Sequence, residues 1–355
     1  MTHISGSGWL RQLTLATTVA LLAGCGGNGD PPAEVPSDGS SASSGPGTAS
    51  PPAAQVGPLA FMRYDAEENW QMWVACGDLV EATQVTDISG RDSGFPVWSP
   101  DGSRIAFDSN RDDPNPVDDP KINDVFTMEP DGSGVIRLTD GRGFHSDPAY
   151  SPDGSLIAFA SDPGRLSEKQ GIYLMNAADG SQVRRVTSLP PAASLDYAPR
   201  FSPDGTQLVF TRDVDEAAGD AAIYVVNLDG SGLRKITSGG FYPGDADWSP
   251  DGTRIVFEAS DPQFPFGGVW IVGSDGRGLR NVTATASGVG DLDGFSDPVW
   301  SPDGSLVLLL HGVHPSAGEE AVAGLATIRP DGTELQYIGD GRGAEHQADW
   351  SSSEC

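Results

Sequence analysis

A tetrapeptide, Ser-Pro-Asp-Gly, recurs along this chain and constrains the fold more than any other feature of the sequence. It begins at Ser99, Ser151, Ser202, Ser249 and Ser301. A degenerate sixth copy begins at Ser351, and successive copies lie 47 to 52 residues apart. A fixed period of this length is the signature of an architecture in which one supersecondary unit is stacked many times.

The residues around each copy also repeat. An aromatic residue precedes each serine: Trp98, Tyr150, Phe201, Trp248, Trp300 and Trp350. An apolar segment follows the turn, then a variable loop, a second apolar segment, an Asp-Gly turn and a short closing segment. Pro presets φ for a type I turn and Gly accepts the left-handed conformation, so each tetrapeptide predicts a tight turn between strands. Four strands in each unit of about 50 residues predict a blade of a β-propeller.

The pattern of an aromatic residue, Ser-Pro-Asp-Gly and then Ile-Ala-Phe or a variant of it resembles the WD40-like repeat of TolB-type β-propellers, over about residues 58–355. The resemblance implies an all-β fold of four-stranded antiparallel blades and partners among envelope proteins. The segment 59–61 matches the second strand of a blade, so the first strand of blade one must come from residues 347–351. We therefore expect six blades, with blade one closed by the C-terminal strand, because ring closure removes exposed sheet edges.

The N-terminal residues 1–24 predict an export signal. Arg11 precedes an apolar run, residues 13–22, that is too short to span a bilayer. The sequence Leu-Ala-Gly-Cys ending at Cys25 resembles the lipobox of bacterial lipoproteins, which implies lipidation of Cys25 and attachment to the outer membrane, facing the periplasm or the cell surface. An ordinary signal peptide with a chance cysteine is the alternative. Residues 25–57 are rich in Gly, Ser and Pro and predict a flexible linker.

The chain is strongly acidic, with 50 Asp and Glu against 21 Lys and Arg and a formal net charge of −29. Such a charge repels phosphate backbones, which excludes nucleic acid as the principal ligand. It leaves cations, basic proteins and neutral small molecules. Mutual repulsion also favours a monomer.

Aligning the six predicted first strands on the repeated serine reveals a column of residues four positions before it. The column contains Phe95, Asp147, Ala198, Asp245, Asp297 and Gln347. Nearby positions add His145, Asp196 and His346. The predicted ligand site at the mouth of the central channel therefore comprises His145, Asp147, Asp196, Asp245, Asp297 and His346. Converging carboxylates would focus a negative potential suited to a cation, to a basic ligand or to a polyhydroxyl ligand. Alternatively, these aspartates only cap turns and accept backbone N–H groups.

Two further candidate sites lie outside the channel. The acidic loop 110–120 offers Asp112, Asp113, Asp118 and Asp119 as Ca²⁺ ligands, although their spacing is not that of an EF-hand. Two cysteines remain besides Cys25, and both are expected on the same face of blade one. An exported protein keeps disulfides, so we predict a bridge between Cys76 and Cys355, with two unpaired thiols as the alternative.

No zinc-ligand spacing, phosphate-binding loop or dinucleotide fingerprint is present in the sequence. The sequence therefore favours a membrane-tethered propeller that acts as a binding or protein-interaction module. Its predicted partner is an envelope protein or a small polar ligand, its only membrane contact is the lipid anchor, and Ca²⁺ is the one cofactor considered. The alternative is a carbohydrate-active lyase or hydrolase at the acidic channel mouth. Propeller lyases usually carry a His-rich metal cluster, for which His145 and His346 are the candidates.

Overall fold

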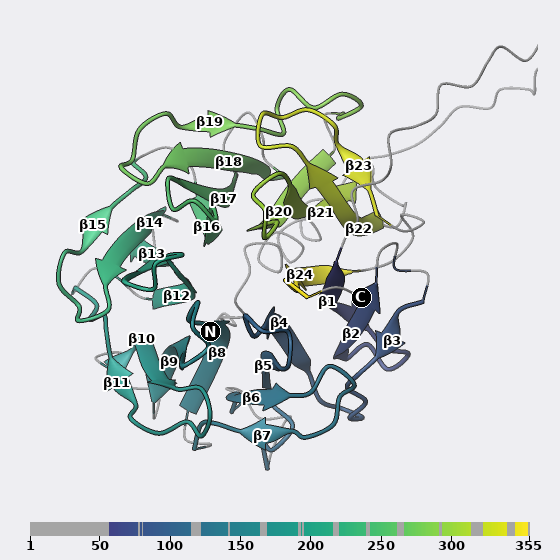
Figure 1. The fold of residues 1–355 in the computed structure, drawn as a ribbon, viewed down its shortest axis with the longest axis vertical. Coiled ribbons are helices and arrows are strands. Elements are labelled where there is room, and N and C mark those ends of the chain that lie inside the picture. The colour runs from purple at the N-terminus through teal and green to yellow at the C-terminus, as the bar shows by residue number, and fades with distance from the viewer. Residues whose placement is uncertain are drawn as a thin grey trace, which may run out of the picture. The chain divides into compact units, whose positions relative to one another are not determined.

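The computed structural model describes residues 57–76, 79, 81–114, 122–140, 143–163, 169–190, 193, 195–215, 220–238, 242–260, 266–290, 293–313, 322–338 and 345–353. These residues form six four-stranded sheets arranged in a ring (Figure 1). The described residues contain no helix long and apolar enough to cross a membrane. The predicted six-bladed β-propeller is confirmed.

Each blade contains four antiparallel strands, with the first strand next to the central axis and the fourth on the circumference (Figure 1). Blade two comprises β4 (Ser93–Trp98), β5 (Ile105–Ser109), β6 (Asp124–Met128) and β7 (Ile136–Arg137). Blade three comprises β8 (Gly143–Tyr150), β9 (Leu156–Pro163), β10 (Gly171–Asn176) and β11 (Arg184–Arg185). Blade four comprises β12 (Leu195–Phe201), β13 (Gln207–Asp215), β14 (Asp220–Asn227) and β15 (Arg234–Lys235).

Blade five comprises β16 (Tyr242–Trp248), β17 (Arg254–Ser260), β18 (Gly268–Gly273) and β19 (Arg280–Asn281). Blade six comprises β20 (Asp293–Trp300), β21 (Val307–Val313), β22 (Val322–Ile328) and β23 (Gln336–Tyr337). Blade one joins the two ends of the chain and comprises β24 (His346–Trp350), β1 (Pro58–Tyr64), β2 (Trp70–Cys76) and β3 (Thr83–Gln84). The predicted closure is therefore confirmed, because β24 pairs antiparallel with β1.

The repeated tetrapeptide builds the turn between the first and second strands. In blade five the Ser249 hydroxyl donates to Asp251, whose carboxylate also accepts the backbone N–H of Thr253. Gly252 has φ 68°, the left-handed conformation that glycine adopts without steric cost. These contacts lower the pKa of Asp251 to about 2, chiefly through the Ser249 hydrogen bond, so the turn stays ionised and capped at neutral pH.

The hydrophobic core lies between the blades. The buried apolar residues that the structure describes form six clusters, one at each interface between neighbouring blades. The aromatic residue before each tetrapeptide contributes to this packing, as with Trp248, which is 6% exposed and packs with Val209 of the preceding blade. The apolar side chains thus fill the spaces between blades, which leaves the axis of the ring for polar groups.

Candidate functional site in the central channel

The six first strands share one irregularity at the position of the predicted column. Each pairs with its second strand through a register shift at this point, as in a β-bulge. The column residues all have positive φ: Phe95 (53°), Asp147 (52°), Ala198 (48°), Asp245 (43°), Asp297 (51°) and Gln347 (44°). A non-glycine residue with positive φ is uncommon and costs about 1–3 kcal/mol, and such strain concentrates at functional sites. The ring therefore holds one strained residue per blade at the same height.

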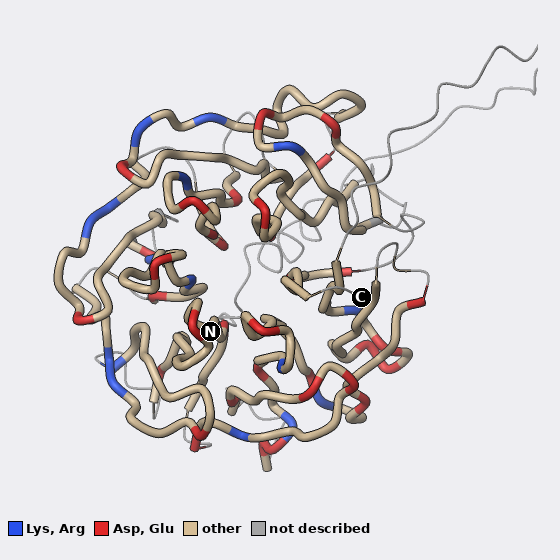
Figure 2. The backbone as a smooth tube through the Cα atoms, viewed as in Figure 1, with Lys and Arg blue, Asp and Glu red and all other residues tan. Residues whose placement is uncertain are grey.

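A small pocket of about 20 Å³ lies among these bulges. Five of the six column residues line it, together with Arg200 and Asp247, which follow the bulges of β12 and β16. Figure 2 shows acidic residues on the strands around the centre of the ring. The pocket is thus a narrow polar space that fits an ion or the tip of a side chain.

Two carboxylates that line this pocket, Asp245 and Asp297, lie close to a third, Glu258. Asp245 and Asp297 come from the bulges of β16 and β20, and Glu258 comes from β17. Their nearest ligand oxygens all lie within 4.8 Å of one another. A divalent cation such as Ca²⁺ binds oxygens at 2.3–2.6 Å, so two of its ligands lie at most about 5 Å apart. The separation of the three carboxylates therefore fits a single cation.

The electrostatics of this cluster are unfavourable for three negative charges. Burial, with the nearby charges of Asp297 and Asp147, raises the pKa of Asp245 to about 8. Burial, together with Asp245 and Asp297, raises the pKa of Glu258 well above its usual value. Burial also raises the pKa of Asp297 to about 6. The cluster thus holds protons near neutral pH, and a bound cation would displace them.

Arg200 is the one basic residue among the described residues that line this pocket. Its charge lowers the pKa values of several channel carboxylates, opposing the effect of burial. Even so, burial raises the pKa of Asp349 to about 7, and the pKa of Asp247 is also raised. One guanidinium therefore does not compensate for the surrounding acids.

Hydrogen bonds between neighbouring blades fix the positions of these carboxylates. Glu258 accepts the backbone N–H of Asp297 over 3.0 Å. The Gln347 side chain donates to Asp297, and Asp108 of β5 accepts the backbone N–H of Asp147 over 3.1 Å. Each of these bonds joins the second strand or the bulge of one blade to the bulge of the next. The carboxylates are therefore held in place by the ring itself.

The structure brings together three of the six residues predicted for the channel mouth. Asp245 and Asp297 line the pocket, and the charge of Asp147 acts on Asp245. His145 instead hydrogen-bonds Ser161 and lies against Phe159. Asp196 and His346 also lie outside the lining of the pocket.

Asp196 and His346 belong to separate contacts. Asp196 is 0% exposed and forms a bidentate ion pair with Arg212, at 2.6 and 2.7 Å. The His346 ring contacts the Trp70 ring at 4.8 Å between centroids, and burial lowers the pKa of His346 to about 4. Burial therefore keeps His346 neutral near pH 7.

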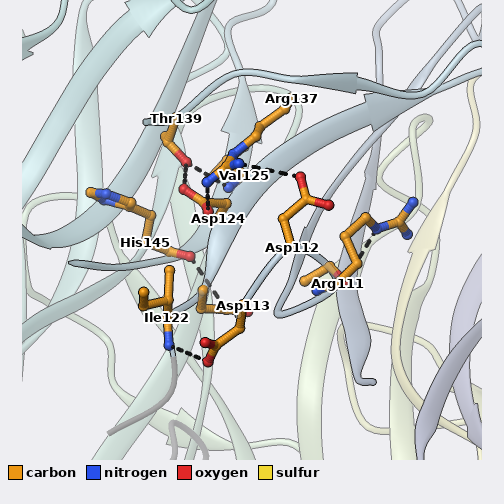
Figure 3. A network of polar contacts seen from close by, with 11 residues as sticks. Arg111, Asp112, Asp113, Ile122, Asp124, Val125, Arg137, Thr139 and His145 are labelled. Atoms are coloured by element: carbon orange, nitrogen blue, oxygen red, sulfur yellow. Dashed lines mark hydrogen bonds and ion pairs between the residues drawn. The ribbon is translucent and has the colours of Figure 1, made fainter. Parts of the chain in front are cut away.

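The two described aspartates of the acidic loop take part in a separate polar network (Figure 3). Asp113 accepts the backbone N–H of Ile122 over 2.9 Å, and Asp112 pairs with Arg137 over 3.3 Å. Arg137 also pairs with Asp124 of β6 over 2.6 Å. Asp118 and Asp119 lie outside the described residues, so Ca²⁺ binding by this loop stays a prediction.

Of the three cysteines, the structure describes only Cys76, at the end of β2. It is disulfide-bonded. Cys355, its predicted partner, lies outside the described residues, and the pairing stays a prediction. Cys25 and the rest of residues 1–56 also lie outside them.

Several channel residues were not predicted from the sequence. Glu258 and Asp108 lie on second strands, where each acid directly follows an apolar run that ends in Phe. Asp247 and Asp349 occupy the position before the repeated aromatic, where each carboxylate accepts the backbone N–H of the corresponding Trp in the next blade. An acid directly after the apolar run of a second strand was the available signal for the first pair.

Comparison with known proteins places the chain beside TolB propellers. Residues 191–346 match the family model of the TolB beta propeller domain. A protein TolB homolog of Chlorobium luteolum is 32% identical over 184 residues, which are 51% of this chain and 35% of that protein. The crystal structure of TolB from Acinetobacter baumannii superposes with a TM-score of 0.64 at 21% identity, covering 83% of this chain and 66% of that one.

The fold is also that of proteins with other activities. An oligogalacturonate lyase in complex with manganese superposes with a TM-score of 0.50 at 16% identity, covering 80% of this chain and 74% of that one. The chain spans between about a third and a half of the length of the curated relatives that it matches first. The comparisons therefore establish a TolB-type propeller fold, with the TolB beta propeller domain recognised in residues 191–346.

Proposed function

We propose that this chain is a binding module of the bacterial envelope whose ligand site is the acidic channel. The observation that carries the proposal is the cluster of Asp245, Glu258 and Asp297, with ligand oxygens within 4.8 Å. Three ionised carboxylates packed together, two half-buried and one buried, with one arginine nearby, are costly unless a positive charge is bound between them. The ligand is therefore a cation, either a divalent metal ion or the basic group of a partner protein.

The location and the partner follow from the sequence and from the relatives. The lipobox-like sequence ending at Cys25 would tether the propeller to the outer membrane through residues 25–57. TolB homologs among the relatives support an envelope protein as partner. Mass spectrometry of the mature N-terminus tests the anchor, since an acylated Cys25 is expected and a free N-terminus elsewhere would contradict it.

Calorimetric titration of metal-free protein with Ca²⁺ tests the channel site. Wild-type protein should release or absorb heat on binding and melt at a higher temperature, because a ligand bound only by the folded state stabilises it. Asp245→Asn should abolish both effects. Asp275→Asn is the matched control, because Asp275 is an exposed carboxylate, 62% accessible, in an outer turn.

The outcome also separates the two forms of the proposal. If Ca²⁺ gives no heat and no melting shift, the metal version is wrong. Crosslinking in intact cells then tests the protein partner, with wild type capturing a specific envelope protein that Asp245→Asn does not capture. Failure of both experiments would contradict a ligand site in the channel.

A carbohydrate-active enzyme is not favoured. The metal-ligating groups that cluster in the described part of the chain are Asp245, Glu258 and Asp297, without a histidine. His145 and His346 lie in separate contacts, with Ser161 and Trp70 respectively. The likeness to a lyase concerns the fold alone.

A further inference from the structure

The circumference of the ring carries a repeated contact between neighbouring blades. The first residue of the fourth strand is an arginine in blades three, four and five, and we call these residues the rim arginines: Arg184, Arg234 and Arg280. Arg184 donates to the Leu228 carbonyl over 2.6 Å. Arg234 donates likewise to the Ser274 carbonyl over 2.6 Å, and Arg280 to the carbonyl of Pro330.

Each acceptor carbonyl immediately precedes the Asp-Gly turn of the next blade. Leu228, for example, precedes Asp229 and Gly230. The pKa of Asp229 is lowered, mainly by hydrogen bonds from Ser231 and also by the charge of Arg184. Arg184 therefore lies beside both a carbonyl oxygen and a carboxylate of the neighbouring blade.

The other three blades carry different residues at this position. Blades two and six have Ile136 and Gln336, whereas blade one has Thr83, the smallest of the three side chains. Thr83 pairs with Val74 just as Arg234 pairs with Val225.

The acceptor that corresponds to Thr83 is the carbonyl of Pro130, which Asp131 follows. The Thr83 side chain is too short to reach this carbonyl as a rim arginine would. Among the described residues, no hydrogen bond is found that the Pro130 carbonyl accepts. Blade two therefore presents this carbonyl and carboxylate at its border with blade one, which lacks the arginine that serves their counterparts.

The Asp-Gly turn of blade two nevertheless packs against blade one in the same way that the Asp-Gly turn of blade four packs against blade three. A Cβ placed on Gly132 would lie 2.4 Å from the carbonyl oxygen of Val85. The equivalent distance from Gly230 to the carbonyl of Val186, beside Arg184, is 2.7 Å. The backbone frame of the contact is therefore preserved, and only the guanidinium is missing.

A groove occupies the place of the missing side chain. Its volume is about 670 Å³, and its lining includes Val74, Cys76, Glu81, Thr83, Pro130 and Asp131. The described residues that line it include two carboxylates and no Lys or Arg. Figure 2 shows Lys and Arg along the outermost strands β11, β15 and β19, whereas β3 consists of Thr83 and Gln84.

We propose that this groove, the rim slot, binds an arginine side chain of a partner protein. A guanidinium placed there would donate to the Pro130 carbonyl and face the Asp131 carboxylate, as Arg184 does at Leu228 and Asp229. Its aliphatic stem would lie on the side chains of Val74 and Val85. The planar fork of arginine can serve two acceptors at once, whereas lysine is a compact and strongly hydrated charge. The rim slot lies on the circumference and is independent of the channel site.

The experiment titrates the full chain with a tri-arginine peptide blocked at both ends, in about 150 mM salt so that long-range attraction is screened. A blocked tri-lysine peptide of the same charge is the comparison. Wild type should bind tri-arginine more tightly, with methyl NMR shifts at Val74 and Val85. Thr83→Arg should fill the slot and weaken tri-arginine binding about tenfold or more, as loss of a charged hydrogen bond implies.

The control for added charge is Val183→Arg, because Val183 is 56% exposed and immediately precedes β11, away from the rim slot. It should bind tri-arginine as wild type does. Thr83→Arg should also melt at or above the wild-type temperature, because it recreates a contact that three other blades make. If Thr83→Arg folds poorly, Asp131→Asn provides the second test and should weaken tri-arginine binding.

Three results would overturn the proposal. The first is equal affinity for tri-arginine and tri-lysine. The second is an equal loss of tri-arginine affinity in Thr83→Arg and Val183→Arg. Either result would indicate that the peptide is attracted by net charge alone. The third is loss of tri-arginine binding in Asp245→Asn, which would place the peptide in the channel. That third result would support the channel proposal, so failures of the two proposals are distinguishable.

Discussion

The replacement Asp349→Asn tests the electrostatics of the channel most simply. Asp349 accepts the backbone N–H of Trp98 over 2.8 Å, and the side-chain oxygen of an asparagine can accept the same bond. Burial raises the pKa of Asp349 from 3.8 to about 7. The folded state therefore holds this proton more tightly than the unfolded chain does. The resulting stabilisation of the folded state is complete below about pH 4 and is lost as pH rises to about 7.

The magnitude follows from the pKa change. A change of one pKa unit corresponds to about 1.36 kcal/mol, so about three units give at most roughly 4 kcal/mol. Because Asp349 is only half-buried and shares its surroundings with Arg200 and Asp247, we expect about 2–4 kcal/mol. The introduced amide does not ionise, so the variant should gain stability over wild type as pH rises from 4 to 7, and the difference should be constant above about pH 8.

Urea unfolding at several pH values between about 4 and 9 measures this difference. Asp275→Asn, at an exposed site, should change the free energy of unfolding little at any pH. A constant difference between Asp349→Asn and wild type across this range would contradict the raised pKa, since it would mean that Asp349 ionises as easily in the folded state as in the unfolded one.

Three further predictions concern the scaffold. Gly230→Ala should lower the melting temperature more than Gly252→Ala, because both have positive φ but only Gly230 would place a Cβ 2.7 Å from a backbone oxygen; equal effects would contradict this. Arg212→Met should cost about 3–5 kcal/mol in denaturant unfolding, because it leaves a carboxylate that is 0% exposed without its ion-pair partner; a cost under about 1 kcal/mol would refute it. Cys76→Ser and Cys355→Ser should each cost the same, about 2–4 kcal/mol, if the two cysteines form one bridge; two titratable thiols in oxidised wild-type protein would exclude that bridge.

The repeat made the fold predictable from the sequence. The tetrapeptide sets each turn, the aromatic before it sets the end of each first strand, and the incomplete blade at the N-terminus required a strand from the C-terminus. The structure places these elements as expected, with β24 on β1. This worked because the local turn chemistry and the global closure of the ring specify the same arrangement.

The site was predictable only in part. Asp147, Asp245 and Asp297 stand at one offset from the repeated serine, so alignment of the repeats found them. The bulge then breaks the alternation of side chains, so residues two positions earlier no longer face the channel. His145 and Asp196 accordingly take part in contacts with Ser161 and Arg212.

Glu258 escaped prediction for a different reason. It lies on a second strand, in a run that reads as buried and apolar, and its approach to Asp245 and Asp297 depends on how two blades pack. The rim slot could not be predicted from the sequence either. A threonine at position 83 is informative only once the structure shows that Arg184, Arg234 and Arg280 contact the neighbouring blade from the equivalent position. Both features belong to the spaces between blades rather than to any one strand.

The channel holds more carboxylates than Arg200 can neutralise, and we propose that a cation supplies the missing charge. Carbon-13 NMR of the Asp245 and Asp297 side-chain carboxyls, titrated with pH before and after addition of Ca²⁺, tests this claim directly. Without Ca²⁺, these carboxyls should titrate with pKa values of about 8 and about 6, and Ca²⁺ should lower both values. Titration of both groups near their ordinary value of about 4, unchanged by Ca²⁺, would contradict it.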